Sequence, residues 1–173
     1  YCKVVSNMRC VNPTQHSKAL SGFTDSQRKA VEEILGGPVH GRSWEQAMTA
    51  IKRGGLGLRP CEDHASAAYV ASSKGISKLV GAMDPQIDPS DEGGFSGITK
   101  AWKDARERMP SDADVELTHR FKQSKLSALI DAQRLVELRT KCQEDTAYTI
   151  HLATMEMRGA GAFLIAPPGK DVR

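Results

Sequence analysis

The sequence predicts a mainly α fold, an irregular helical bundle in two small lobes that an acidic, Pro/Gly-rich linker joins. Apolar residues recur at helical spacing through most of the chain. No window alternates apolar and polar residues as a half-buried strand does, and the one candidate strand is the short apolar run at residues 163–166. We therefore expect a lobe at residues 1–83, the linker at residues 84–97 and a second lobe at residues 98–173.

The beginning of the first lobe is expected to hold two helical stretches. An apolar repeat with four-residue spacing predicts a helix over residues 1–11, which a following proline ends. Residues 14–37 also have helical periodicity, with a break expected near Gly22. Thr24 and Gln27 fit a capping box directly after that glycine, so we expect the second part of the stretch to start there.

Three further signals complete the first lobe. Gly36, which a second glycine and a proline follow, is expected to end the preceding helix. Another capping box at Ser43 predicts a short helix over residues 43–51. Small and apolar residues then predict a closely packed helix from about residue 61 to residue 83, with Gly75 as a candidate interruption.

The second lobe is expected to contain three or four helices. Residues 98–109 are predicted as a short amphipathic helix, residues 115–142 as one or two helices, and residues 144–157 as the last. The residues that we expect to face inward from the first of these are Ile98, Ala101, Trp102 and Ala105. The linker before them contains prolines, glycines and four acids, which is typical of an exposed connection.

A glycine-rich corner at residues 53–60 (RGGLGLRP) separates two of the predicted helices. It lacks the third glycine of a dinucleotide-binding fingerprint and the Gly-Lys-Ser/Thr of a phosphate loop. We therefore predict a structural turn, in which the glycines allow the change of direction and the leucines enter a core. The residues of this structural corner are Gly54, Gly55, Leu56, Gly57 and Leu58.

Composition narrows the classes of function. No apolar run approaches the ~20 residues of a membrane-spanning helix, which predicts no membrane partner. The four cysteines have no Cys-x-x-Cys pair, which favours reduced thiols in an intracellular protein, nuclear or cytoplasmic. Cys61 and His64 have a two-ligand spacing, but zinc needs further ligands that the sequence does not place nearby, so no metal site is expected.

The sequence contains no self-sufficient catalytic constellation. Its acidic pairs are adjacent residues, which point in different directions from a helix, and no Gly-x-Ser-x-Gly motif is present. We predict no catalytic residue and no cofactor for this chain, and a stand-alone enzyme of unknown type is the weakest interpretation.

Positive charge is concentrated before the corner. Residues 1–60 carry nine Lys or Arg and four Asp or Glu, in a chain whose net charge is +3. Such a balance permits a polyanionic partner. Lys52, Arg53 and Arg59 flank the corner, where they could contact a nucleic-acid backbone or form a solvated basic rim.

Several segments match, in order, a pattern found in one polyprotein family. They are residues 3–13 (KVVSNMRCVNP), 44–47 (WEQA), 53–60 (RGGLGLRP), 64–72 (HASAAYVAS), 123–131 (QSKLSALID) and 159–164 (GAGAFL). In this order and approximate spacing, they resemble the region that follows the palm of non-LTR retrotransposon reverse transcriptases. The match covers nearly the whole chain. One departure is Ala50-Ile51-Lys52, which stands where the family usually has a Leu-Pro pair and adds positive charge at the corner.

This resemblance implies a thumb and connector that helps to hold the template–product nucleic acid. The family's paired catalytic aspartates and their Mg²⁺ belong to the palm, which we expect upstream of this chain and as its packing partner. The hypothetical nucleic-acid-binding residues are then Arg9, Lys52, Arg53 and Arg59. Two alternatives remain: an inactive transposon relic, and a host-adopted, non-catalytic helical module that binds protein or nucleic acid.

Overall fold

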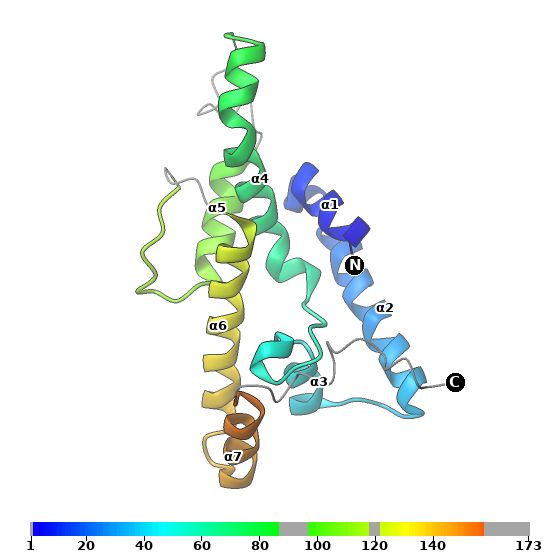
Figure 1. The fold of residues 1–173 in the computed structure, drawn as a ribbon. Helices are drawn as coiled ribbons and strands as arrows, with labels where there is room; N and C mark the ends of the chain where they lie inside the picture. Colours follow the sequence, from blue (N-terminus) through cyan, green and yellow to red (C-terminus); the bar gives the residue numbers. More distant parts are fainter. Residues whose placement is uncertain (1, 87–96, 118–121, 158–173) are drawn as a thin grey trace, which may run out of the picture. The chain divides into compact units, whose positions relative to one another are not determined.

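The computed structural model describes residues 2–86, 97–117 and 122–157, and it confirms a mainly α protein (Figure 1). These ranges contain no strand. Most of the predicted linker and the stretch at residues 163–166 lie outside them. The helices are α1 (Cys2–Cys10), α2 (Ser17–Leu35), α3 (Gly41–Ala47), α4 (Cys61–Met83), α5 (Ile98–Glu107), α6 (Gln123–Lys141) and α7 (Thr146–Met155), with the 3₁₀ turns η1 (Pro13–Gln15) and η2 (Ile51–Arg53).

The chain divides into two compact units. The first consists of Tyr1–Lys29 and Pro60–Gln133, and the second consists of Ala30–Arg59 and Arg134–Arg173. Each unit thus combines segments from both of the consecutive lobes that we expect from the sequence. The helices α2 and α6 contribute residues to both units.

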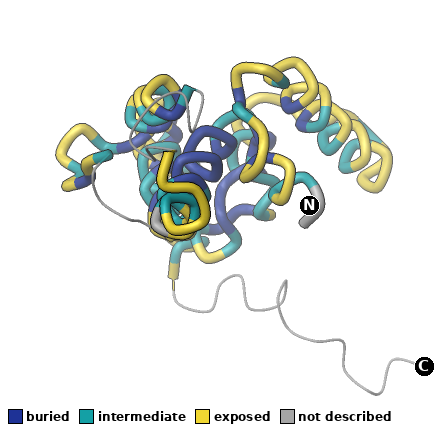
Figure 2. Tube along the Cα trace, turned by 90° about the horizontal axis from the view of Figure 1, so that it is seen from above, coloured by how far each residue is buried: buried dark blue, intermediate teal, exposed yellow. Residues whose placement is uncertain are grey.

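The first unit is organised around α4, against which α1 and α5 pack. Small side chains cover the buried part of this helix, which lets its neighbours approach closely. The fully buried alanines on α4 are Ala65, Ala67 and Ala68. The inward face that we expect for α5 is confirmed, since Ile98, Ala101 and Ala105 are buried and Trp102 packs beside them. Figure 2 shows these buried stretches in dark blue.

The break predicted near Gly22 is wrong, because α2 runs through it without interruption. Thr24 therefore does not begin a helix of its own. It is buried within α2, where its hydroxyl donates to Glu62 Oε2 at 2.5 Å and accepts from the backbone N–H of Cys61 at 3.2 Å. Gly22 faces open space, so the helix accommodates it at the cost of its low propensity alone. The candidate interruption at Gly75 is absent too, since α4 continues past it.

The expected stop at Gly36 is confirmed. Gly36 has φ +72°, its N–H donates to the Glu33 carbonyl, and the N–H of Gly37 donates to the Glu32 carbonyl. These two bonds are the Schellman pattern that satisfies the last carbonyls of α2. The next helix differs from the expected residues 43–51: α3 begins at Gly41 and ends at Ala47. Its buried residues Trp44 and Ala47 form one of the buried clusters of the second unit with Met48.

Candidate nucleic-acid interface

The glycine-rich corner follows η2 in the second unit, and two of its glycines have backbone conformations that favour glycine. Gly54 has φ +82° and Gly57 has φ +71°. Gly55 is required for a different reason: a Cβ there would collide with the carbonyl oxygen and the hydroxyl of Thr49. A Cβ on Gly54 would collide with the Met155 side chain from α7. The corner is therefore a tightly packed turn.

The backbone amides of the corner already have partners. The N–H donors of residues 53–58 bond to carbonyls of the preceding segment: Arg53 to Ala50 (2.8 Å), Gly54 to Ile51 (3.0 Å), Gly55 to Ala50 (3.2 Å), Leu56 to Ala47 (3.0 Å), Gly57 to Thr49 (2.9 Å) and Leu58 to Ala47 (3.3 Å). A phosphate loop needs N–H groups that point at its ligand. The geometry of this corner therefore offers no cradle for phosphate.

The two leucines of the corner differ in their environments. Leu58 packs against the buried cluster of Trp44, Ala47 and Met48, as expected. Leu56 is 46% exposed, so the prediction that it enters the core is wrong. Besides the packing of Leu58, the corner is held by backbone hydrogen bonds to carbonyls of residues 47–51, which a sequence pattern does not reveal.

Three of the predicted nucleic-acid-binding residues lie in the second unit. Lys52 and Arg53 occupy the end of η2, with Lys52 exposed and Arg53 half-buried. Arg59 follows the corner and is half-buried. Positive charge at the C-terminal end of η2 complements the negative end of its dipole, which favours Lys52 and Arg53 at this place without a ligand. Arg9 belongs to the first unit.

Gln46 links α3, the corner and α7, and the sequence analysis did not single it out. Its Nε2 donates to the Gly54 carbonyl at 3.2 Å and lies 3.3 Å from Nε2 of His151. Its Oε1 accepts from the Tyr148 hydroxyl at 2.9 Å, and burial raises the pKa of that phenol. The sequence feature that could have identified Gln46 is the Trp-x-Gln-Ala segment, in which the glutamine is one of the matching positions.

The start of α7 is held by a capping carboxylate. Asp145 Oδ1 accepts from the Tyr148 N–H at 3.0 Å, and its Oδ2 accepts from Arg42 Nη1 at 2.7 Å. The Tyr148 N–H, followed by Arg42, holds the pKa of this carboxyl below its usual value. In its ionised form, Asp145 thus caps α7 and bonds the start of that helix to Arg42 of α3.

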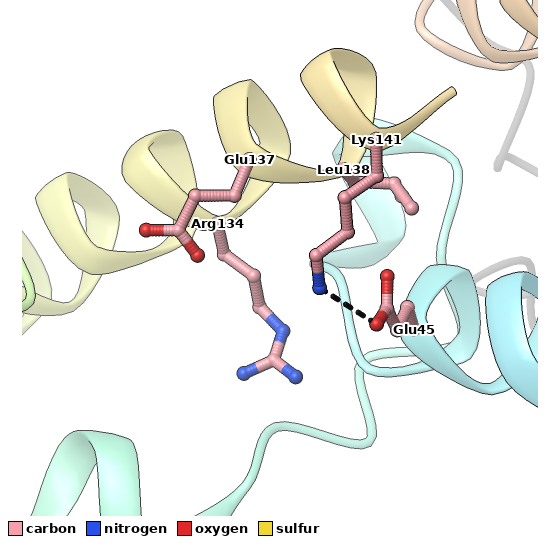
Figure 3. A pocket seen from close by; sticks show the side chains of 5 residues that line it. All are labelled: Glu45, Arg134, Glu137, Leu138 and Lys141. Atoms are coloured by element: carbon pink, nitrogen blue, oxygen red, sulfur yellow. Dashed lines mark hydrogen bonds and ion pairs between the residues drawn. The ribbon is translucent and has the colours of Figure 1, made fainter.

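A small hollow of about 90 Å³ lies between α3 and α6 in the second unit (Figure 3). Its lining contains two acidic side chains, Glu45 and Glu137, and two basic ones, Arg134 and Lys141. Lys141 Nζ donates to Glu45 Oε1 at 2.8 Å. The hollow is small and its charges balance, so it has no preference for an anion.

Arg9 lines a larger hollow, of about 450 Å³, in the first unit. Its Nε donates to Gln123 Oε1 at 2.6 Å, and Lys122 and Ser72 line the same hollow. Of these residues, only Arg9 is a nucleic-acid-binding candidate from the sequence, and Lys122 and Gln123 are not. Gln123 begins one of the matching segments, whereas no pattern marks Lys122.

No group of three metal-ligating side chains occurs in the described residues. Burial, reinforced by the neighbouring Glu62 carboxylate, raises the pKa of Cys61 to about 11. The Cys61 thiol is therefore protonated and unreactive as a nucleophile at neutral pH. None of the helices described is long and apolar enough to cross a membrane.

No family model matches the chain, and neither the curated proteins nor the solved structures provide a significant match.

Proposed function

We propose that this chain is the thumb and connector of a non-LTR retrotransposon reverse transcriptase. In this proposal it grips the template–product duplex through phosphate contacts and has no catalytic activity of its own. The catalytic aspartates and Mg²⁺ would belong to a palm domain upstream.

The observation that carries this proposal is that the resembling segments contact one another at their matching positions. Arg9, from the first segment, bonds to Gln123, which lies 114 residues later. His64 and Asp131 belong to two other segments and meet in the core of the first unit. Gln46 donates to the Gly54 carbonyl, and this hydrogen bond joins two further segments, residues 44–47 and 53–60. These contacts join the resembling segments within each unit, as is expected if the segments belong to a folded thumb and connector.

The corner supports the binding role by making a rigid base for its cations. Its amides are engaged within the turn, so contact with phosphate falls to the side chains of Lys52, Arg53 and Arg59. Contacts of this kind position a duplex without reading its bases, and their strength falls as salt rises.

A second function, a helical module that binds a protein, is favoured by one exposed surface. Ile76, Leu79 and Met83 lie three and four residues apart on α4 and are 45%, 62% and 77% exposed. Such spacing places them along one face of the helix. In the reverse transcriptase proposal the part of this face at Leu79 and Met83 would pack on the palm, and in a host-adopted module the face would bind another protein.

The proposal is tested by binding and activity assays on the chain. We expect binding to a primer–template duplex whose logarithm falls linearly with the logarithm of the salt concentration. Primer extension by the chain alone would contradict the assignment, as would the absence of duplex binding at low salt. The coding sequence upstream of Tyr1 separates the alternatives, because an in-frame palm with paired aspartates supports a polymerase and stop codons support a relic.

A further inference from the structure

The hollow beside Arg9 differs in charge from two other hollows in the described residues. Its lining includes Arg9 and Lys122 and no acidic residue. A second hollow in the first unit pairs Lys100 and Arg108 with Glu62 and Asp104. The hollow in the second unit is likewise balanced. An anion would therefore be attracted to the Arg9 hollow without repulsion from its walls.

The polar side chains of this hollow are suited to a phosphate ester. The bond from Arg9 Nε to Gln123 Oε1 fixes one edge of the guanidinium, whose remaining N–H donors are of the kind that binds phosphate oxygens. Accepting that bond leaves the Gln123 amide group as a donor, and Ser72 adds a hydroxyl from α4.

The other wall of the hollow is apolar. Ile76 is exposed there, with Gly75 and Ala71 beside it on α4. A volume of about 450 Å³ lies within the usual range for small-ligand sites, about 300–1,000 Å³. The combination of a cationic wall and an apolar wall fits a phosphate with the sugar or base attached to it.

We propose that this hollow binds one nucleotide unit of a nucleic-acid strand, with the phosphate against Arg9 and Lys122 and the sugar or base against Ile76. The inference rests on the proposed function for the identity of the polymer. It adds an open hollow, lined by residues of α1 and α4 and by Lys122 and Gln123 at the start of α6, to a grip that would otherwise consist of the cations beside the corner.

Gly75 allows a test that removes no charge. A Cβ at this position has nothing within 4 Å, and Gly75 lies within α4 and lines the hollow, so we expect Gly75→Leu to occupy part of the hollow. Leucine also has a higher helix propensity than glycine, so the melting temperature should be equal or higher. Gly22→Leu is the matched control, because Gly22 also lies within a helix and also faces open space.

The measurement is the affinity for a fluorescent primer–template duplex at several salt concentrations. We expect Gly75→Leu to weaken binding about tenfold and Gly22→Leu to leave it unchanged. We expect Arg9→Gln combined with Lys122→Gln to reduce the slope of log affinity against log salt by about 2, whereas Lys103→Gln, at an exposed site on α5, should have little effect.

The outcomes separate the two proposals. If the wild-type chain binds the duplex and Gly75→Leu binds equally well, the hollow is not a nucleotide site, while the proposed function stands. If the wild-type chain binds no nucleic acid, both fail. A parallel titration with adenosine monophosphate distinguishes the source of the phosphate, because binding of the monophosphate as tight as that of the duplex would contradict a site for a strand.

Discussion

His64 Nε2 lies 3.6 Å from Asp131 Oδ1, and each side chain is 3% exposed. The pair connects α4 to α6 within the first unit. Because both side chains are removed from water, each depends on polar partners inside the protein. The pair therefore adds a polar contact between these two helices to the contacts that their alanines and leucines make.

Replacing Asp131 should consequently destabilise the first unit. We expect Asp131→Ala to lower the free energy of unfolding by about 2–3 kcal/mol, because the buried histidine loses its carboxylate. Urea unfolding measures this quantity, and Asp112→Ala, at an exposed site, is the matched control. A loss as small as that of the control would mean that the pair contributes nothing to docking.

Substituting a glycine should raise or lower stability according to the space around it. Gly55→Ala places a Cβ against the carbonyl oxygen and hydroxyl of Thr49, so we expect destabilisation by about 1–3 kcal/mol. Gly22→Ala, within α2 and facing open space, should stabilise by about 0.5–1 kcal/mol. Chemical denaturation of the two variants provides the comparison. Equal effects would contradict the close packing of the corner.

Acidification should release α7 from its cap. The pKa of Asp145 is lower in the folded chain than the 3.8 expected when unfolded, so its carboxylate stabilises the fold above that value. This contribution is lost as the pH falls below 3.8 and through the lowered pKa. Asp145→Asn retains a capping group but has no such titration. Melting temperatures of the two proteins should therefore converge as the pH falls, and a constant difference would contradict this role.

The cysteines should differ in reactivity. Cys10 is exposed, whereas Cys61 and Cys142 are buried, and the pKa of Cys61 is raised to about 11. In a Cys2→Ser background, we expect an alkylating reagent at pH 8 to modify Cys10 quickly and the other two only after unfolding. Peptide mass mapping identifies the modified thiols, and rapid labelling of Cys61 in the folded chain would contradict its burial.

Since the pKa of Cys61 in the folded chain exceeds the ordinary 9.0, the contribution of its protonated thiol to stability is present below pH 9 and is lost as the pH rises towards 11.

Local patterns in the sequence predicted much of the fold. The stop at Gly36, the small-residue face of α4 and the inward face of α5 depend on spacing within one helix, and the structure confirms each. The errors involve distant partners. Thr24 has the pattern of a cap, but the side chain of Glu62 and the backbone of Cys61 occupy its hydroxyl, and no local rule anticipates that.

The candidate site, too, could be predicted from the sequence only where it depends on residues close together in the chain. The positions of Lys52, Arg53 and Arg59 beside a turn followed from the sequence, because the turn is local. The hollow beside Arg9 did not, since Gln123 and Lys122 reach it from more than a hundred residues away. The exposure of Leu56 could not be predicted either, because hydrophobicity alone does not say which of two nearby leucines faces the core.

The central claim is that the cations beside the corner contact a nucleic-acid backbone. The most direct measurement compares duplex binding by the variant Lys52→Glu, Arg53→Glu, Arg59→Glu with that of Lys18→Glu, Lys29→Glu, Lys103→Glu, whose exposed side chains lie outside the corner. Both variants change the net charge equally, so a difference between them reports position, and circular dichroism checks that both fold. We predict that the corner variant loses at least about a hundredfold in affinity at low salt and that the control loses much less. Equal affinities for the two variants would contradict the account.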